Sequence, residues 1–256
     1  MPVAVVFIGP AGSGKTSLSK SYYEWIRRNL FLKAALVNLD PGVEGLDYKP
    51  VFDIRDMFTL RGIMERYGLG PNGAFVKASE LIAERVDEIF LNPPFININE
   101  WDIVIIDTPG QMEAFIFRPV SNTFFRRLVK HANTVLAYLI DASTIETISD
   151  AVFSWFIYVL IQIKTGLLTV PIISKRDIAK NPEILKVLIE KPEKLAEIAL
   201  ERESGLSVEV IPDLVEIALK TKSALRAIMV SSMDSDDISN LHRFLSEAFC
   251  VCGDMT

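Results

Sequence analysis

The sequence predicts an α/β fold built on a doubly wound, mostly parallel sheet. Short apolar runs rich in β-branched residues alternate with amphipathic helical patterns, which is the order of strands and helices in such folds. The runs are nearly continuous rather than alternating, as expected for strands that helices cover on both faces. The length of 256 residues fits one such domain with insertions, so we expect a single domain over residues 1–256.

The predicted elements follow one another in a strand-then-helix order. Strands are expected at residues 3–8, 34–38, 103–106, 134–140 and 170–173, with a weaker one at 226–230. Helices are expected at residues 17–30, 78–90, 114–131, 149–164 and 239–249. The alternation provides the helical crossovers that neighbouring parallel strands require.

Two segments are too long to be simple connections. One covers about residues 48–100 and the other about residues 178–223. The second contains Asn181-Pro182-Glu183 and Lys191-Pro192-Glu193, each typical of a helix start. We expect both segments to be helical insertions, and insertions of this length commonly carry function or contacts.

Composition restricts the class of partner. The net charge of −6 argues against a broad nucleic-acid-binding face, so no direct nucleic-acid contact is expected. The mean hydropathy of +0.28 indicates either thorough burial or a surface that a partner subunit covers. Cys250 and Cys252 are the two cysteines, and we interpret them as plain thiols of a reducing, cytoplasmic protein. The apolar run at 151–163 is short for a membrane span, so we expect a buried or interface helix and no membrane.

A phosphate-binding pattern follows the first predicted strand. Residues 9–16 read GPAGSGKT and match G-x-x-x-x-G-K-[ST] in full. Glycines let the backbone approach phosphates, Lys15 reaches the β and γ phosphates, and the Thr16 hydroxyl is a ligand for Mg²⁺. A strand before the pattern and a helix after it give the required context, and the fold is therefore expected to be of the P-loop NTPase type. The nucleotide-binding residues expected here are Gly12, Ser13, Gly14, Lys15, Thr16 and Ser17.

A second group of polar residues ends the third predicted strand, where the chain reads Asp107-Thr108-Pro109-Gly110-Gln111. Asp107 is placed to hold Mg²⁺, and the Gly110 N–H to approach the γ-phosphate. Gln111 is placed to orient an attacking water.

A third group points to the base. Asp177, after the fifth predicted strand, can accept from the ring N–H and the exocyclic amine of guanine, whereas adenine presents an acceptor at that ring nitrogen. Lys175 is expected along the base plane, and Ser232 to bring a backbone N–H to the base. Guanine-reading motifs usually begin with Asn or Thr where this chain has Ser174, and a polar loop after a strand is the alternative.

Taken together, these motifs resemble those of the GPN-loop GTPases. The resemblance covers essentially the whole chain and is carried by GPAGSGKT at 9–16, NLDPGVE at 38–44, DIRD at 53–56, Gly70-Pro71-Asn72, and DTPGQME at 107–113. It implies a homodimer in which Gly70, Pro71 and Asn72 of one subunit reach the phosphate site of the other. Eukaryotic members of that family assist the assembly and nuclear import of RNA polymerase, so the resemblance also implies a protein client.

The resemblance completes the list of expected roles. Asp40 is placed near Mg²⁺ and the attacking water, Glu44 supports that site, and Glu113 acts with Gln111 in the switch. The expected catalytic residues are Lys15, Asp40, Asn72, Gln111 and Glu113, and the expected metal ligands are Thr16, Asp40 and Asp107.

These residues predict slow hydrolysis of GTP to GDP and phosphate that switches the shape of a dimer. One alternative is a P-loop kinase that transfers the γ-phosphate to a small acceptor, but Gln111 favours water and the 178–223 segment is not rich in arginine. Another is a nucleotide-gated assembly factor, which is compatible with hydrolysis. The aromatic stretch 115–125 and the run 151–163 are either core or a dimer or client face.

Overall fold

The computed structural model describes residues 1–220 and 227–253, with side chains as far as residue 249. In that part of the chain, the strands form one sheet in the order β3-β2-β4-β1-β5-β6-β7, and every neighbouring pair is parallel. The strands are β1 (Val3–Ile8), β2 (Ala34–Asn38), β3 (Phe52–Asp53), β4 (Ile103–Asp107), β5 (Asn133–Asp141), β6 (Thr169–Ser174) and β7 (Ile228–Met229). The prediction of a doubly wound, parallel α/β sheet is confirmed.

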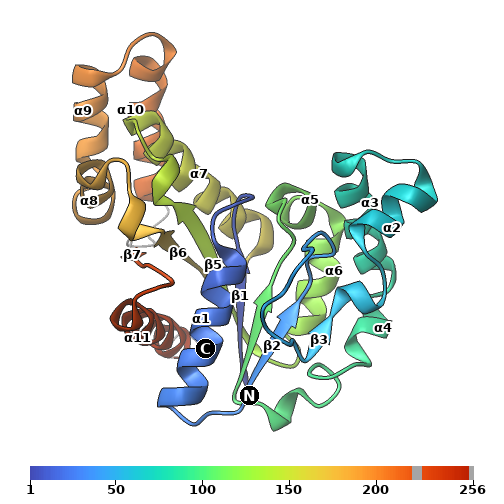
Figure 1. Ribbon diagram of the computed structural model, residues 1–256. Helices are drawn as coiled ribbons and strands as arrows, with labels where there is room; N and C mark the ends of the chain where they lie inside the picture. Colours follow the sequence, from blue (N-terminus) through green and yellow to red (C-terminus); the bar gives the residue numbers. More distant parts are fainter. Residues whose placement is uncertain (221–226, 254–256) are drawn as a thin grey trace.

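Helices cover both faces of this sheet (Figure 1). They are α1 (Lys15–Asn29), α2 (Leu60–Tyr67), α3 (Pro71–Glu84), α4 (Val86–Phe90), α5 (Met112–Ile116), α6 (Pro119–Leu128), α7 (Ile148–Thr165), α8 (Pro182–Glu190), α9 (Lys194–Arg202), α10 (Leu206–Lys220) and α11 (Ser235–Gly253). Short 3₁₀ turns are η1 (Ile54–Asp56), η2 (Ile98–Glu100), η3 (Ala142–Thr144) and η4 (Arg176–Ile178). The side chains of Cys250 and Cys252, and Arg226 of the predicted last strand, lie outside the described part.

The alternation of side chains along β1 divides the core into two layers. Val5 and Phe7 pack with α1 and α11 on one face, where Tyr22 and Leu241 are also buried. Ala4, Val6 and Ile8 belong to the larger apolar cluster on the opposite face, which includes residues of α3, α5, α6 and α7. Because every strand of the sheet runs in the same direction, the loops that follow β1, β2, β4, β5 and β6 meet at one edge.

The first insertion differs from the sequence prediction in two ways. It contains β3, a short edge strand that pairs with β2 through Val37 and Asn38 and was not predicted. The predicted helix 78–90 begins earlier, at Pro71, and is interrupted at Arg85 to give α3 and α4. Proline at the first helical position is favourable because its fixed φ suits a helix and the N–H it lacks has no intrahelical acceptor.

A proline also divides the predicted helix 114–131. Arg118 is extended, with φ −106° and ψ 166°, and Pro119 begins α6, so α5 ends after only five residues. A residue before proline is disfavoured in the helical region, which explains the break. In the second insertion, Asn181 caps α8 by accepting from the Ile184 N–H, as the sequence predicts.

Helix α7 carries the most apolar sequence of the chain. In the described part, it is the helix that is long and apolar enough to cross a membrane by length and composition alone. One side of it is buried, including Trp155 and Tyr158, and it packs against α5, α6, α8, α9 and α10. Phe153 and Ile163 are exposed on the other side.

Candidate nucleotide-binding site

The phosphate loop runs from the end of β1 into α1. Gly12 and Gly14 have positive φ values of 77° and 88°, a conformation that L-residues with a side chain rarely adopt. Gly14 is the residue before the first turn of α1, so the turn presents backbone N–H groups at a helix start. Ser13 and Lys15 are buried there, Ser17 lies exposed in the first turn of the helix, and the loop has the geometry that the sequence predicts.

Lys15 folds across this loop. Its Nζ donates to the carbonyl oxygens of Gly9 at 2.8 Å, Pro10 at 2.9 Å and Gly110 at 3.3 Å. Burial lowers the pKa of Lys15, while the nearby Asp107, Asp40 and Glu113 carboxylates oppose that effect. The ammonium is therefore held among oxygen acceptors at the junction of the loops that follow β1 and β4.

Thr16 and Asp107 form the second contact between these loops. The Thr16 hydroxyl donates to Asp107 Oδ2 at 2.7 Å. Asp107 is fully buried, and its Oδ1 has no hydrogen-bond partner in the described part of the chain. Burial raises the pKa of Asp107 to about 7. A buried carboxylate oxygen without a partner, next to a hydroxyl, fits Mg²⁺, which is bound by one or two carboxylates together with other oxygen ligands.

Asp40 connects the loop after β2 to the loop after β4. Its Oδ1 accepts from the Gly42 N–H at 2.8 Å, and its Oδ2 accepts from the Gly110 N–H at 2.9 Å. Burial raises the pKa of Asp40, and these two N–H groups act in the opposite direction. The N–H that the sequence assigns to the γ-phosphate is thus bonded to a carboxylate of the protein.

A polar network supports Asp40 from the edge of the sheet. Asn38 accepts from the Asp40 N–H at 3.0 Å and donates to Asp53 Oδ1 at 2.9 Å. Asp53 pairs with Arg55 at 2.6 Å, and Arg55 donates to the Val43 carbonyl at 3.1 Å. β3 therefore fixes the loop that carries Asp40, and Glu44 lies exposed on a cavity of about 690 Å³ that Asp53 and Arg55 also line.

Asn72 lies against Gln111 of its own chain. The Gln111 Nε2 donates to Asn72 Oδ1 at 2.9 Å. Gly70, Pro71 and Asn72 are exposed at the start of α3. The resemblance implies a contact between this loop and the neighbouring subunit, and the contact within one chain is additional to that expectation. Glu113 is exposed within electrostatic range of Lys15.

On the base side, Ser174 is bonded to the phosphate loop rather than directed at a ligand. Its buried hydroxyl donates to the Ser13 carbonyl at 2.8 Å, with the Ile140 carbonyl at 3.2 Å. Serine therefore fastens the end of β6 to the phosphate loop. Since its side chain is used in this way, its departure from the usual Asn or Thr leaves the choice of base to neighbouring groups.

Lys175 is aligned by an ion pair. Its Nζ lies 2.6 Å from Asp141 Oδ2, and a Cβ placed on Gly14 would lie 3.9 Å from Lys175 Cε. The lysine stem thus passes beside the phosphate loop, where the sequence predicts the plane of the base. Asp141, the last residue of β5, is the group that holds it there.

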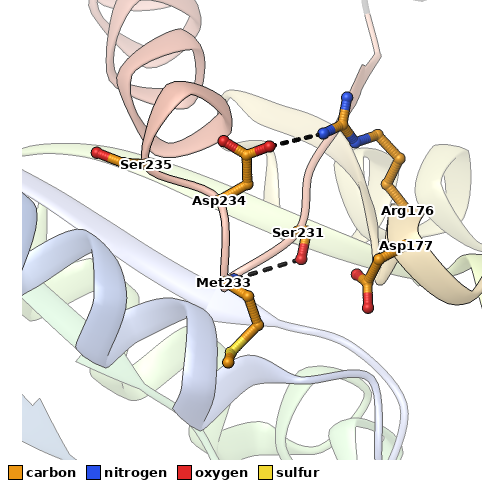
Figure 2. A pocket seen from close by; sticks show the side chains of 6 residues that line it. All are labelled: Arg176, Asp177, Ser231, Met233, Asp234 and Ser235. Atoms are coloured by element: carbon orange, nitrogen blue, oxygen red, sulfur yellow. Dashed lines mark hydrogen bonds and ion pairs between the residues drawn. The ribbon is translucent and has the colours of Figure 1, made fainter.

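A cavity of about 670 Å³ lies next to these residues, and its lining residues are drawn in Figure 2: Arg176, Asp177, Ser231, Met233, Asp234 and Ser235. The Asp177 carboxylate is exposed and has no hydrogen bond or ion pair within the described residues. The loop after β7 forms the opposite wall. Asp177 and the segment that contains Ser232 therefore lie on the same cavity, and their contacts with a base stay a prediction.

Comparisons with known proteins agree with this geometry. A family profile described as a conserved hypothetical ATP binding protein matches residues 7–252. GPN-loop GTPase PAB0955 of Pyrococcus abyssi is 31% identical over 98% of this chain and 99% of its own length. The chain belongs to the GPN-loop GTPase family.

Two further matches agree with this assignment. The crystal structure of PAB0955, described as a GTPase in apo form, has a TM-score of 0.82 and 30% identity, covering 98% of each chain. GPN-loop GTPase 3 of Kluyveromyces lactis is 31% identical over 73% of this chain and 68% of its own. The resemblance stated from the sequence motifs is confirmed.

Sequence reasoning about this GPN-loop GTPase chain did not identify several contacts of the site. It gave no role to Arg176, whose guanidinium pairs with Asp234 at 2.9 Å and Asp237 at 3.0 Å. It also did not pair Asp40 with Gly110 or Asp141 with Lys175. The signal that the sequence offered for these contacts was an aspartate at or shortly after the end of a strand. A sequence does not state which loop such a side chain will bind.

Proposed function

We propose that this protein binds GTP with Mg²⁺ and hydrolyses it to GDP and phosphate, and that the bound nucleotide changes the protein's conformation. The observation that carries this proposal is the bonding of Gly110. Its N–H donates to Asp40 and its carbonyl accepts from Lys15. The Gly110 N–H and the Lys15 ammonium are the two donors that a γ-phosphate would engage. Binding of a γ-phosphate would therefore break both contacts and rearrange the loops after β2 and β4.

The residues divide the chemistry among them. Lys15 leaves the loop carbonyls to neutralise the β and γ phosphates, and the N–H groups of residues 12–17 surround those phosphates. Thr16 and Asp107 would hold Mg²⁺, with Asp40 nearby. When bound, the ion neutralises charge that develops on the phosphate oxygens.

Asp40, Gln111 and Asn72 are proposed to position the attacking water. Asp40 can accept a hydrogen bond from that water once the Gly110 N–H is released. The Asn72 contact restricts the Gln111 side chain, so we propose that Asn72 orients Gln111 within its own subunit. Glu113, two residues further along, adds negative charge near Lys15 and acts with Gln111 in orienting the water.

The base is proposed to be guanine. The Asp177 carboxylate lacks an intramolecular partner in the described residues and can accept two hydrogen bonds from the guanine edge. Lys175 packs along the base, and the Ser232 N–H meets the base from the opposite loop. The description of the family profile mentions ATP, whereas the relatives from Pyrococcus abyssi and Kluyveromyces lactis are named GTPases.

We further propose a single domain over residues 1–256 that acts as a cytoplasmic homodimer. Support for one domain comes from the larger apolar cluster, which contains Ile82 of the first insertion and Leu188 of the second. The exposed Gly70 and Pro71 offer a surface for a second subunit. A protein client, with RNA polymerase among the candidates, is proposed from the family resemblance.

The proposal is tested by measuring phosphate release and calorimetric binding with GTP, GDP and ATP, each with Mg²⁺ and with EDTA. We expect GTP hydrolysis without any added acceptor, dependence on Mg²⁺, and tighter binding of GTP than ATP. Thr16→Ala should abolish the Mg²⁺-dependent hydrolysis of GTP, whereas Thr123→Ala, at a half-buried position of α6, should leave it unchanged. Preferential binding of ATP, or phosphate release that requires an acceptor, would refute it.

A further inference from the structure

The loop after β7 is held in place by one arginine. Arg176 lies beside Asp177 in η4, and Figure 2 shows its side chain directed toward Asp234, away from the Asp177 carboxylate. Its Nη2 lies 2.9 Å from Asp234 Oδ2 and 3.0 Å from Asp237 Oδ2. One guanidinium therefore joins the loop that follows β6 to the loop that follows β7.

The carboxylate at the inner end of this contact is buried. Asp237 is 5% exposed, and its Oδ2 also accepts from the Ser231 N–H at 2.8 Å. A buried charge that is paired and hydrogen-bonded is held more firmly than an exposed ion pair, because removing one partner leaves the other charge uncompensated. The Arg176 contact is thus anchored in the protein and is more than a surface ion pair.

The contacts around this anchor use most of the backbone N–H groups of residues 231–234. The Ser231 N–H is used by Asp237, the Met233 N–H contacts Ser231 Oγ at 3.3 Å, and the Asp234 N–H donates to the Ser231 carbonyl at 3.2 Å. Among the described residues 231–234, the Ser232 N–H is the one without a hydrogen bond. It is therefore a backbone donor that a ligand could use.

A free N–H at this position distinguishes guanine from adenine. Guanine carries an acceptor, O6, at the position where adenine carries an amino group that donates. An N–H donor held against that edge is therefore favourable for guanine and leaves an unmatched pair of donors with adenine. Asp177 reads the adjacent ring N–H and amino group, so the two loops read neighbouring parts of one edge.

We propose that Arg176 is a positioning residue for base selection: by binding Asp234 and Asp237, it holds the Ser232 N–H at the distance from Asp177 that guanine requires. This inference rests on the proposed function, because it assumes a purine nucleotide in the site. The backbone contact of Arg176 does not depend on its guanidinium. The Arg176 N–H donates to the Val230 carbonyl at 3.1 Å, so a side-chain substitution leaves the pairing of the strand ends intact.

The test replaces the guanidinium and measures selectivity rather than binding alone. Arg176→Met keeps a long apolar stem without the donors, and we expect about a tenfold weaker affinity for GDP, the effect of one well-placed hydrogen bond. The affinity for ADP, measured by competition with a fluorescent GDP analogue, should stay within about twofold. IDP keeps O6 and the ring N–H, so its affinity should fall by the same factor as that of GDP.

Turnover separates positioning from structural damage. For Arg176→Met we expect the KM for GTP to rise about tenfold while kcat stays within about twofold, because the phosphate groups are not touched. Asp234→Asn should shift the KM in the same direction by less, since its Oδ1 still accepts from the Asp236 N–H. Lys180→Met is the matched control. It removes an exposed ion pair between Lys180, which follows η4, and Glu146, and it should leave both KM and kcat unchanged.

The outcomes are distinct. Equal losses of GDP and ADP affinity would show that Arg176 only stabilises the fold, and an unchanged GDP affinity would show that it does nothing for the base; either result overturns the inference. If the wild-type protein binds no guanine nucleotide, the proposed function fails instead.

Discussion

The contact between Asp40 and Gly110 leads to a prediction about the relative affinity for GTP and GDP. In Asp40→Asn, one carboxylate oxygen becomes an NH₂ group, which cannot accept from a backbone N–H. Whichever way the amide turns, the contact with the Gly110 N–H is either lost or reduced to a neutral hydrogen bond. Hydrogen bonds to charged groups are about twice as strong as neutral ones, so the contact weakens by about 1–2 kcal/mol.

That free energy should appear as a change in preference. GTP must break the Asp40–Gly110 hydrogen bond to reach the Gly110 N–H, whereas GDP, which lacks the γ-phosphate, leaves it in place. We therefore expect Asp40→Asn to raise the affinity for a non-hydrolysable GTP analogue relative to GDP by about 5- to 30-fold. GTP turnover should fall by about 100-fold or more, because the water loses its charged acceptor.

Calorimetry with the GTP analogue and with GDP checks the change in preference, and single-turnover phosphate release checks the fall in GTP turnover. Glu113→Gln is the charge control: it also removes a negative charge near Lys15, but Glu113 is exposed, and within the described residues Gly110 is hydrogen-bonded to Lys15 and Asp40 rather than to Glu113. We expect its preference for GTP over GDP to change by less than about twofold, since solvent screens exposed charges. If Asp40→Asn leaves the preference unchanged, or Glu113→Gln changes it equally, the proposed exchange at Gly110 is wrong.

Three further predictions concern single side chains. Ser174→Ala removes the buried donor to the Ser13 carbonyl and should lower the free energy of unfolding by about 1–2 kcal/mol in urea, whereas Ser174→Thr, which keeps the hydroxyl, should cost less than half as much. Asn72→Ala should lower kcat by at least about tenfold, and mixing it with Lys15→Ala subunits should restore no activity if it orients Gln111 in its own chain; recovery would establish a role across the dimer. Burial lowers the pKa of His242, so near and below pH 6.5 the folded state binds fewer protons than the unfolded state. The free energy of unfolding should therefore fall on acidification through that range. Between pH 7.5 and 5.5, the wild type should lose more free energy of unfolding than His242→Gln.

The residues that sequence reasoning located best are those whose role follows from their position along the chain. Lys15 and Thr16 are fixed by the glycine pattern between a strand and a helix, and Asp107 by its place at a strand end. Each belongs to a local pattern with a known backbone geometry. In the structure, these three lie together at the end of β1 and β4.

Contacts between distant segments were not predictable in the same way. The Ser174 hydroxyl binds a carbonyl 161 positions away, and the Asp40 carboxylate binds an N–H 70 positions away. The edge strand β3 has only two residues, too few for an alternating or continuous apolar pattern. These features depend on the packing of the sheet, which a single sequence does not encode as a local pattern.

The Gly-Pro-Asn segment forms the first turn of a rod. Helix α3 has 14 residues, a length of about 21 Å, and it packs against α2, α5 and α6. A displacement of Gln111 would reach the first turn of this helix through its hydrogen bond to Asn72. If the helix shifts as a rigid unit, its opposite end at Glu84 and Arg85 would move as well. The first insertion thereby links the phosphate site to the surface around α4, and hydrogen exchange there, compared with and without GTP, would show whether the nucleotide state is felt at that distance.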